Sequence, residues 1–527
     1  MTLMMMMIMM YHSPSKVRTK KRGLPPHVLY VLASALCLGL LVIMWNVYQL
    51  KMMQEAHFNG HGPYPGAQAQ VAEASAGSVD SYRRPVVWIH AKHVNSGYLK
   101  HVMAVFERAG YIRGDAQSSW DVLWAHDYPF KELAAVMASL KPYQKVNHFP
   151  GTGFITNKVY LATSDIAYIP KAFQMPGQRD AFLVETKQNP DTLWVQKSSS
   201  HRGIKVKSIA DLDLYAANTF IQQYISKPYL IDGKKFDLGF YVTLTSVDPL
   251  RVYVLHDEML VRFCAKEYNP IDFGDVNKYV VGDDYTPVWK MPSLQKYYQE
   301  YNYNFMETMN GYWRSKGEDP DKIYSQIYEA IRGVFVSKYP QLLSAIQRHE
   351  NKHVFFELMR FDFVLDEELN VFLMEVNMSP NLSSAHFTEN THLYERVVYN
   401  VLSVNGVARN VPSSLKNSDS RERGMQVSTK EILVKPDLCS SEKCYTCEKE
   451  ECRICYKCLS PPQRLMLQDA FLEHNNRQSM RRVYPVAVTQ DQAKFYDITS
   501  DRSLHENDQI MREWFIAKCA QDLSFCQ

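Results

Sequence analysis

The pattern of apolar and polar positions is sharpest at residues 355–380, where two apolar runs flank a charged turn at 366–370. This pattern predicts two antiparallel strands joined by a short turn. Opposed residues of an antiparallel pair have a constant index sum, so a turn centred near Glu368 and Leu369 places Asp362 roughly opposite Glu375. Asn377 follows Glu375 by two residues, and its side chain therefore leaves the same face of the sheet.

Asp362, Glu375 and Asn377 thus bring three oxygen-bearing side chains together in an otherwise apolar hairpin. Unpaired carboxylates are costly in such surroundings, which indicates that a cation lies between them. A cluster of oxygen ligands suits Mg²⁺ carrying the phosphates of a nucleotide better than it suits zinc. The alternative is a hairpin whose polar residues face water, and the spacing alone does not separate the two interpretations.

A second β-rich stretch covers residues 220–245 and contains the turn signal Asp232-Gly233. It predicts a strand, a tight turn and a second strand that begins near Lys235. Lys235 and Asp237 alternate with apolar residues, so both side chains are expected on one face of that second strand.

Upstream of this stretch, a short apolar run at 193–197 ends in Lys197 and leads into a polar loop with Arg202 and Gly203. A lysine at a strand end beside a flexible polar loop can hold phosphates through its charge and through backbone N–H groups. A surface turn of Ser, His and Gly has the same composition, so this loop is weak evidence by itself.

The N-terminal part has the pattern of a membrane anchor rather than of a globular fold. A basic tail at 1–27 precedes an uncharged, apolar segment at 28–48, which predicts one transmembrane helix with Trp45 and Tyr48 at the interface. Residues 49–84 predict a linker. A cleaved signal peptide and a buried core helix are the alternatives. By the positive-inside rule, the basic residues before the span place the rest of the chain in the lumen.

Composition is typical of a folded enzyme: a chain of 527 residues with 46% hydrophobic content can bury more than one core. The net charge of +3 produces no global basic field, so nucleic acid is not predicted as a partner.

Cysteines gather near the C-terminus, with six in the segment 439–460 that follows a predicted linker at 411–438. The Cys-x-x-Cys spacings within Cys439–Cys458 are compatible with structural Zn²⁺ in a reducing compartment, and the even count favours disulfides in an oxidising one. Unpaired structural thiols are the remaining alternative. The apolar pattern after residue 460 predicts a helical extension at 461–527.

Residues from about 120 to 400 resemble the tubulin–tyrosine-ligase-like family of ATP-grasp ligases. The resemblance rests on an ordered series of short motifs: Asn147-His-Phe-Pro-Gly151 with Thr156 and Lys158, Tyr168-Ile-Pro-Lys-Ala-Phe-Gln-Met-Pro176, Gln222-Gln-Tyr-Ile225, Lys235-Phe-Asp237, Pro249-Leu-Arg-Val-Tyr253, Arg262-Phe263, Phe361-Asp-Phe363 and Met374-Glu-Val-Asn377. It implies an α+β ATP-grasp domain at 85–410, with the nucleotide held between two β-rich lobes and the predicted transmembrane helix preceding it.

The family's site residues carry over position by position. Phosphate and nucleotide binding would fall to Lys197, Arg202, Gly203, Gln222, Tyr224, Ile225, Lys235 and Asp237. Asp237, Lys235 and Arg262 would be catalytic, with Arg262 binding the carboxylate of the incoming amino acid through its planar fork. Asp362, Glu375 and Asn377 would ligate one or two Mg²⁺ ions.

The resemblance implies an ATP-dependent ligase that adds glutamate to glutamate side chains of tubulin through an acyl phosphate. Glutamate is favoured over glycine because the stretch at 262–269 is similar to that of glutamate-adding members. Tubulin or microtubules and a membrane are the expected partners. Because tubulin and ATP are cytosolic, they indicate that the catalytic domain faces the cytosol. The basic residues before the predicted span indicate instead that it faces the lumen.

Three positions depart from the family pattern. The Lys-Phe-Asp-Leu-Arg motif ends here in Gly239, so one expected cation is missing, and the phosphate loop lacks a proline at Ser198 and a glycine at Lys205. Two alternatives follow: a catalytically degenerate, membrane-anchored binding module, or a ligase that modifies a lumenal protein other than tubulin.

Overall fold

The computed structural model describes residues 84–198, 205–408, 425–496 and 503–527, together with the isolated helical positions Gly39, Met44, Trp45 and Tyr48. The chain divides into two units, Met1–Val79 and Asp80–Gln527, and the second holds all the elements discussed below. Apart from those isolated positions, the predicted transmembrane helix at 28–48 lies outside the described residues. Within the described part, no helix is both long enough and apolar enough to span a bilayer.

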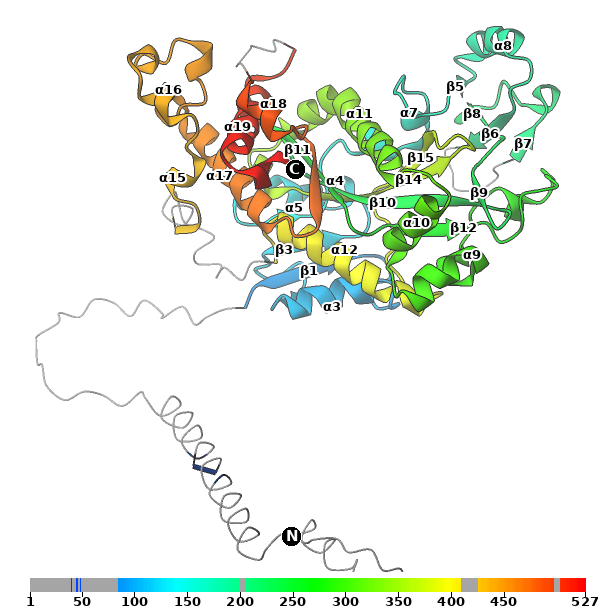
Figure 1. The fold of residues 1–527 in the computed structure, drawn as a ribbon, viewed down its shortest axis with the longest axis horizontal. Helices are drawn as coiled ribbons and strands as arrows, with labels where there is room; N and C mark the ends of the chain where they lie inside the picture. Colours follow the sequence, from blue (N-terminus) through cyan, green and yellow to red (C-terminus); the bar gives the residue numbers. More distant parts are fainter. Residues whose placement is uncertain are drawn as a thin grey trace, which may run out of the picture. The chain divides into compact units, whose positions relative to one another are not determined.

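A small parallel sheet with the strand order β2-β1-β3-β4 opens the second unit. Figure 1 labels two of its strands, β1 and β3, and the helix α3. Its two central strands, β1 and β3, are nearly continuous buried apolar runs, which is typical of parallel strands covered on both faces, whereas the edge strand β2 is largely exposed. Helix α3 links the first two strands, as a parallel pair requires. The elements are β1 (Val86–His90), α3 (Lys100–Arg108), β2 (Ile112–Gly114), β3 (Val122–Ala125) and β4 (Lys145–Val146), with α4 (Pro129–Glu132) and α5 (Ala134–Ala138) between the last two.

A second, antiparallel sheet has the order β5-β8-β6-β7 and its own aromatic core of Phe173, Phe182 and Trp194. Its elements, and the two short helices that lead into it, are α6 (Gly153–Thr156), α7 (Lys158–Ala162), β5 (Ala172–Met175), α8 (Arg179–Gln188), β6 (Trp194–Ser198), β7 (Lys205–Lys207) and β8 (Thr219–Gln223). The strands predicted at 193–197 and after residue 220 are confirmed as β6 and β8.

The largest sheet has eight strands and is antiparallel throughout. Its strands are β9 (Leu230–Ile231), β10 (Lys234–Val247), β11 (Leu250–Leu255), β12 (Leu260–Phe263), β13 (Thr286–Pro287), β14 (Glu357–Leu365), β15 (Val371–Asn377) and β16 (Met480–Tyr484). The predicted turn joins β9 to β10, and both of its residues, Asp232 and Gly233, have positive φ, as a tight hairpin turn requires.

The hairpin of β14 and β15 contains a bulge that the apolar pattern did not reveal. Near the turn, Phe363 pairs with Leu373, whereas beyond the bulge Asp362 pairs with Glu375. The extra residue, Met374, switches which side chains of β15 point to each face. The predicted pairing of Asp362 with Glu375 is confirmed, and the bulge is what turns Glu375 away from the core.

Helices cover both faces of the large sheet. Phe240 contacts Tyr324 of α11, whereas Thr243 accepts a hydrogen bond from Asn405 next to α12. Residues 240 and 243 lie on opposite faces of β10, so α11 and α12 pack on opposite sides, as Figure 1 shows. The helices of this region are α9 (Pro292–Gln295), α10 (Phe305–Ser315), α11 (Pro320–Ile346) and α12 (Thr391–Val404).

The C-terminal part is joined to the large sheet rather than appended to it. Strand β16 pairs with β11, and Glu473 of α17 accepts hydrogen bonds from the buried Arg251 of β11 at 2.8 and 2.9 Å. Besides β16, the elements are α15 (Thr429–Ile432), α16 (Pro436–Ser440), α17 (Pro461–Asn476), α18 (Gln490–Lys494) and α19 (Glu506–Gln521). The predicted helical extension thus also contains a strand of the main sheet.

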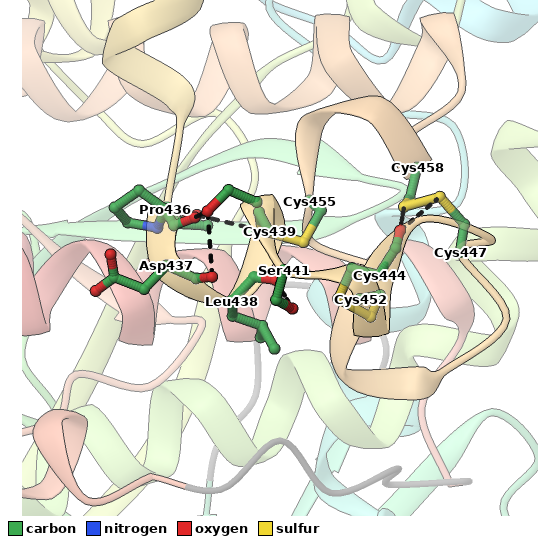
Figure 2. The surroundings of a disulfide bond; sticks show 12 residues. Pro436, Asp437, Leu438, Cys439, Ser441, Cys444, Cys447, Cys452, Cys455 and Cys458 are labelled. Atoms are coloured by element: carbon green, nitrogen blue, oxygen red, sulfur yellow. Dashed lines mark hydrogen bonds between the residues drawn. A yellow bond between two sulfur atoms is a disulfide. The ribbon is translucent and has the colours of Figure 1, made fainter.

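All six cysteines of the segment 439–460 are paired, as Cys439–Cys455, Cys444–Cys452 and Cys447–Cys458 (Figure 2). A fourth disulfide joins Cys519 to Cys526. The suggested Zn²⁺ site at Cys439–Cys458 is therefore wrong for this structure, because zinc binds thiolates and these sulfur atoms are bonded to each other. Of the three interpretations that the spacing left open, zinc, disulfides and unpaired thiols, the structure has the disulfides.

Candidate functional site

One face of β10 carries Lys235, Asp237 and Gly239, which alternate along the strand as predicted. In the register of the sheet, Asp237 lies opposite Arg262 of β12, and Gly239 lies opposite Asp362 of β14. Since directly opposed residues share a face, a polar row crosses β12, β10, β14 and β15. The sheet therefore brings together predicted site residues that are more than a hundred positions apart in the chain.

Asp237 and Arg262 form a two-pronged ion pair. The Arg262 Nε donates to Asp237 Oδ1 at 2.9 Å, and its Nη2 donates to Oδ2 at 2.8 Å. Burial raises the pKa of Asp237 to about 6, because desolvation and the nearby Asp362 together outweigh the effect of Arg262. Arg262, predicted to bind an amino-acid carboxylate, is thus held in one orientation by a buried acid.

Asp362 is 2% exposed and receives hydrogen bonds from three side chains. The Arg360 Nε and Nη2 donate to its two oxygens at 2.6 and 2.8 Å. The Arg262 Nη2 and the Asn377 Nδ2 donate to Oδ2 at 3.3 and 3.0 Å. Two guanidinium groups and one amide therefore fix the position of this carboxylate.

Glu375 lies at the end of the row, beside Lys158 of α7. The Lys158 Nζ is 2.9 Å from Glu375 Oε2, and the Asn377 Nδ2 donates to Oε1 at 3.1 Å. Partial burial alone would raise the pKa of Glu375, but Lys158, Asn377 and Arg360 outweigh it and lower the pKa to about 2. Asn157 caps α7 by accepting from the first backbone N–H groups, which fixes Lys158 at the start of that helix.

Two further lysines lie where the second sheet meets the large one. The Lys197 Nζ donates to Gln222 Oε1 at 2.7 Å, and the Lys235 Nζ lies 5.0 Å from the centre of the Tyr224 ring. Burial lowers the pKa of both lysines, that of Lys197 to about 8, with Glu375 opposing the shift at Lys197. The charged form of a buried lysine with a lowered pKa is stabilised strongly when a phosphate binds beside it and supplies a negative charge.

Three of the predicted nucleotide-binding residues, Gln222, Tyr224 and Ile225, are buried at the end of β8 and just beyond it. Gln222 also donates to the Pro170 carbonyl at 3.2 Å. Arg202 and Gly203, predicted to hold phosphates, lie outside the described residues. The structure thus brings Lys197 close to Gln222 on β8 and Lys235 close to Tyr224 just beyond it. The role of Arg202 and Gly203 in phosphate binding stays a prediction.

The donor set fits Mg²⁺ in its chemistry. Asp362 and Glu375 supply carboxylate oxygens, and Asn377, whose amide group contacts both, supplies a carbonyl oxygen. In the described part of the chain, no cluster of three or more His, Cys, Asp or Glu side chains could hold a metal. A magnesium ion here would therefore depend on these three residues and on oxygens of the nucleotide, as is usual for this ion.

Two residues at the site had no role in the sequence analysis. Lys158 belongs to a matched motif, but only the fold shows that it pairs with Glu375. Arg360 lies two positions before Asp362 on the same predicted strand, so strand periodicity alone would have placed it on the site face. The signal was present, although an arginine in an apolar run is easily taken for an edge residue.

Taken together, the row joins three carboxylates, Asp237, Asp362 and Glu375, to three cations, Arg262, Arg360 and Lys158. Lys197 and Lys235 add positive charge where the two sheets meet. Such an arrangement can bind polyphosphate through its lysines and orient a carboxylate substrate through Arg262.

A model of the family described as "Tubulin-tyrosine ligase family" matches residues 136–417. The chain is similar to "Probable tubulin polyglutamylase ttll-15" of Caenorhabditis elegans, with 39% identity over 84% of this chain and 87% of that protein. It is 29% identical to human "Tubulin monoglutamylase TTLL4" over 50% of this chain and 23% of that protein. For mouse "Tubulin polyglutamylase TTLL6" the identity is also 29%, over 53% and 36%.

Proposed function

The chain belongs to the tubulin-tyrosine ligase family, and we propose that it is an ATP-dependent ligase that adds glutamate to glutamate side chains of tubulin. Its fold is of the ATP-grasp type, and enzymes of this family use ATP and Mg²⁺. The observation that carries the proposal is the polar row across β12, β10, β14 and β15, which joins a fixed arginine fork to a carboxylate pair beside buried lysines. The similarity to a polyglutamylase over most of the chain favours glutamate over glycine.

The reaction needs a leaving group better than hydroxide on the acceptor carboxyl. An oxygen of the acceptor carboxylate attacks the γ-phosphorus of ATP, the bond from that phosphorus to the bridging oxygen breaks, and ADP leaves. The amine nitrogen of the incoming glutamate then attacks the carbonyl carbon, inorganic phosphate leaves, and the amine loses a proton. The protein's share is in-line placement and charge neutralisation.

The site residues supply these two contributions. Lys197 and Lys235 neutralise phosphate oxygens. Because both lysines are buried, a bound polyanion stabilises their charged ammonium groups. Asp362, Glu375 and Asn377 would hold Mg²⁺, which supplies further neutralisation of the phosphates. Asp237 and Asp362 use three of the five N–H donors of Arg262 and leave those of Nη1 for the carboxylate of the incoming glutamate.

The direct test is transfer of labelled glutamate to microtubules by the full chain. We expect ATP-dependent and Mg²⁺-dependent incorporation into the glutamate-rich tails, with little incorporation of labelled glycine. Incorporation that is equal with and without ATP, or absent under all conditions, would contradict the proposal. The full chain is required, because β16 and Glu473 belong to the main fold.

A second candidate is the same chemistry on an acidic protein of an oxidising compartment. The disulfides of the segment 439–460 favour it, since such bonds persist in oxidising surroundings, and so does the predicted orientation of a span at 28–48. Protease digestion of sealed membranes separates the two candidates. A C-terminal tag that is protected in intact vesicles excludes cytosolic tubulin as the direct substrate, and a tag that is digested excludes the lumenal candidate.

The dependence of the reaction on pH should be bell-shaped. Asp237 must be charged to orient Arg262, and burial raises its pKa to about 6, so kcat/KM should rise as the pH increases through about 6. Lys197 must be charged to bind phosphate, and burial lowers its pKa to about 8, so kcat/KM should fall above that pH. Kinetics from pH 5 to 10 measure both limbs.

The variant Lys197→Arg is the control for the alkaline limb, because a guanidinium stays protonated over this range. We expect the fall above pH 8 to move to higher pH in this variant. An alkaline limb identical to that of the wild type would show that Lys197 does not control it.

A further inference from the structure

The side chain of Arg360 covers Gly239, the position at which the family motif has an arginine. A Cβ atom built on Gly239 would lie 3.0 Å from Arg360 Cδ and 3.3 Å from Arg360 Nε. It would also lie 3.3 Å from Asp362 Oδ1. The space that a side chain at position 239 would need is therefore filled by the guanidinium arm of a residue on the neighbouring strand.

The register of the sheet explains how a side chain on β14 can occupy the place of a side chain on β10. Gly239 lies opposite Asp362, and Arg360 precedes Asp362 by two positions on β14. Gly239 and Arg360 are thus diagonal neighbours on one face, close enough for a long side chain from either strand to reach the same point. The cation that the sequence lacks on β10 is present, and it comes from β14.

Arg360 is also built into the charge balance of the site. Its side chain is 7% exposed and forms a two-pronged ion pair with Asp362. Its charge also helps to lower the pKa of Glu375 and opposes the rise at Asp237. Without it, Arg262 and Lys158 would be the cations left in direct contact with the three carboxylates in the described part of the chain, and the buried Asp362 would lose its shortest hydrogen bonds.

We propose that Arg360 is a positioning residue that supplies from β14 the positive charge missing at Gly239, and that it holds Asp362 in place for the metal-bound nucleotide. This inference rests on the proposed function, and it means that Gly239 is not a mark of a degenerate enzyme. Glycine fits this position because a side chain there would crowd the arm of Arg360 and the carboxylate of Asp362. The two positions act as one unit, so neither can be changed alone.

A charge swap between the strands tests this in the full chain, with Arg360→Gly, Arg360→Lys, Gly239→Arg and the double variant Gly239→Arg/Arg360→Gly. The first readout is the apparent affinity for Mg²⁺–ATP, measured by the rise in Tm with nucleotide concentration. We expect Arg360→Gly to weaken it by about 10- to 100-fold, as for other residues that orient metal ligands. Arg360→Lys should keep part of it, and the double variant should recover most of it.

Gly239→Arg alone should lower the Tm without nucleotide, because its Cβ is crowded by Arg360 and a third guanidinium joins two others. The second readout is glutamate transfer, in which Arg360→Gly should lower kcat and the double variant should restore it. A purely structural role would change the Tm without nucleotide and leave the affinity for Mg²⁺–ATP unchanged.

The inference would be overturned by unchanged affinity for Mg²⁺–ATP in Arg360→Gly, or by a double variant that binds as weakly as Arg360→Gly. A higher activity in Gly239→Arg than in the wild type would also overturn it. Failure of the proposed function has a different signature, namely a wild type that binds Mg²⁺–ATP but transfers no glutamate to microtubules. In that case the binding readout still decides whether Arg360 acts as proposed.

Discussion

Replacing Glu375 with glutamine should lower glutamate transfer by at least about 100-fold, the usual effect of removing one group that stabilises charge at a reacting centre. The substitution keeps the shape of the side chain and removes the charge that pairs with Lys158 and that would bind Mg²⁺. The fold should be nearly unaffected, because Glu375 and Lys158 are both partly exposed and water can replace the lost partner. Initial rates with labelled glutamate, together with the Tm, measure both effects.

The matched control is Glu367→Gln, which removes a carboxylate from the same hairpin at its exposed turn. Glu367 pairs with Lys227, and the two side chains are 56% and 75% exposed. This control should keep wild-type activity. A Glu375→Gln variant that transfers glutamate within about threefold of the control would show that Glu375 takes no part in the reaction.

Glu473→Ala should have the largest effect on stability, a loss of about 3–5 kcal/mol, which is the usual cost of removing one partner of a buried ion pair. Glu473 accepts from Arg251 Nε and Nη2, from the Thr245 hydroxyl at 2.9 Å and from the Tyr253 hydroxyl at 3.3 Å. The substitution leaves the Arg251 guanidinium charged and buried without its partner. Urea unfolding followed by circular dichroism gives the free energy of unfolding.

The control for this prediction is Glu367→Ala, which breaks an exposed ion pair and should cost within about 1 kcal/mol. The double variant Arg251→Met/Glu473→Leu removes both charges at once and should recover most of the lost stability, because apolar pairs of similar volume replace buried ion pairs well. If Glu473→Ala costs no more than Glu367→Ala, the C-terminal part is not anchored through this contact.

The sequence predicted the elements that carry the site because their patterns are local. The strand periodicity of β10 fixed the common face of Lys235 and Asp237, and the two apolar runs around the turn fixed the hairpin of β14 and β15. The pairing of Asp362 with Glu375 was correct, although the bulge at Met374 that produces it was not foreseen. A bulge changes one residue of register and leaves almost no trace in an apolar pattern.

Features that depend on contacts between distant segments could not be read in this way. Recognising that Arg360 takes the place of the cation missing at Gly239 requires knowledge of the register between β10 and β14. The pairing of the cysteines requires the path of the chain, since six cysteines allow fifteen connectivities. The addition of β16 to the sheet requires a partner more than two hundred residues away, and no local pattern encodes it.

The late position of β16 in the chain also determines when the large sheet can finish folding during synthesis. Residues 256–479 separate β11 from its partner β16, so β11 emerges long before that partner exists. Until then, the edge of β11 that β16 will occupy presents unpaired backbone groups, and such edges recruit other strands. Long-range strand pairing is slow and exposes a nascent chain to aggregation. Because the last strand of this sheet is encoded so late, we expect the chain to depend on chaperones during synthesis and chains that stop before Met480 to be insoluble.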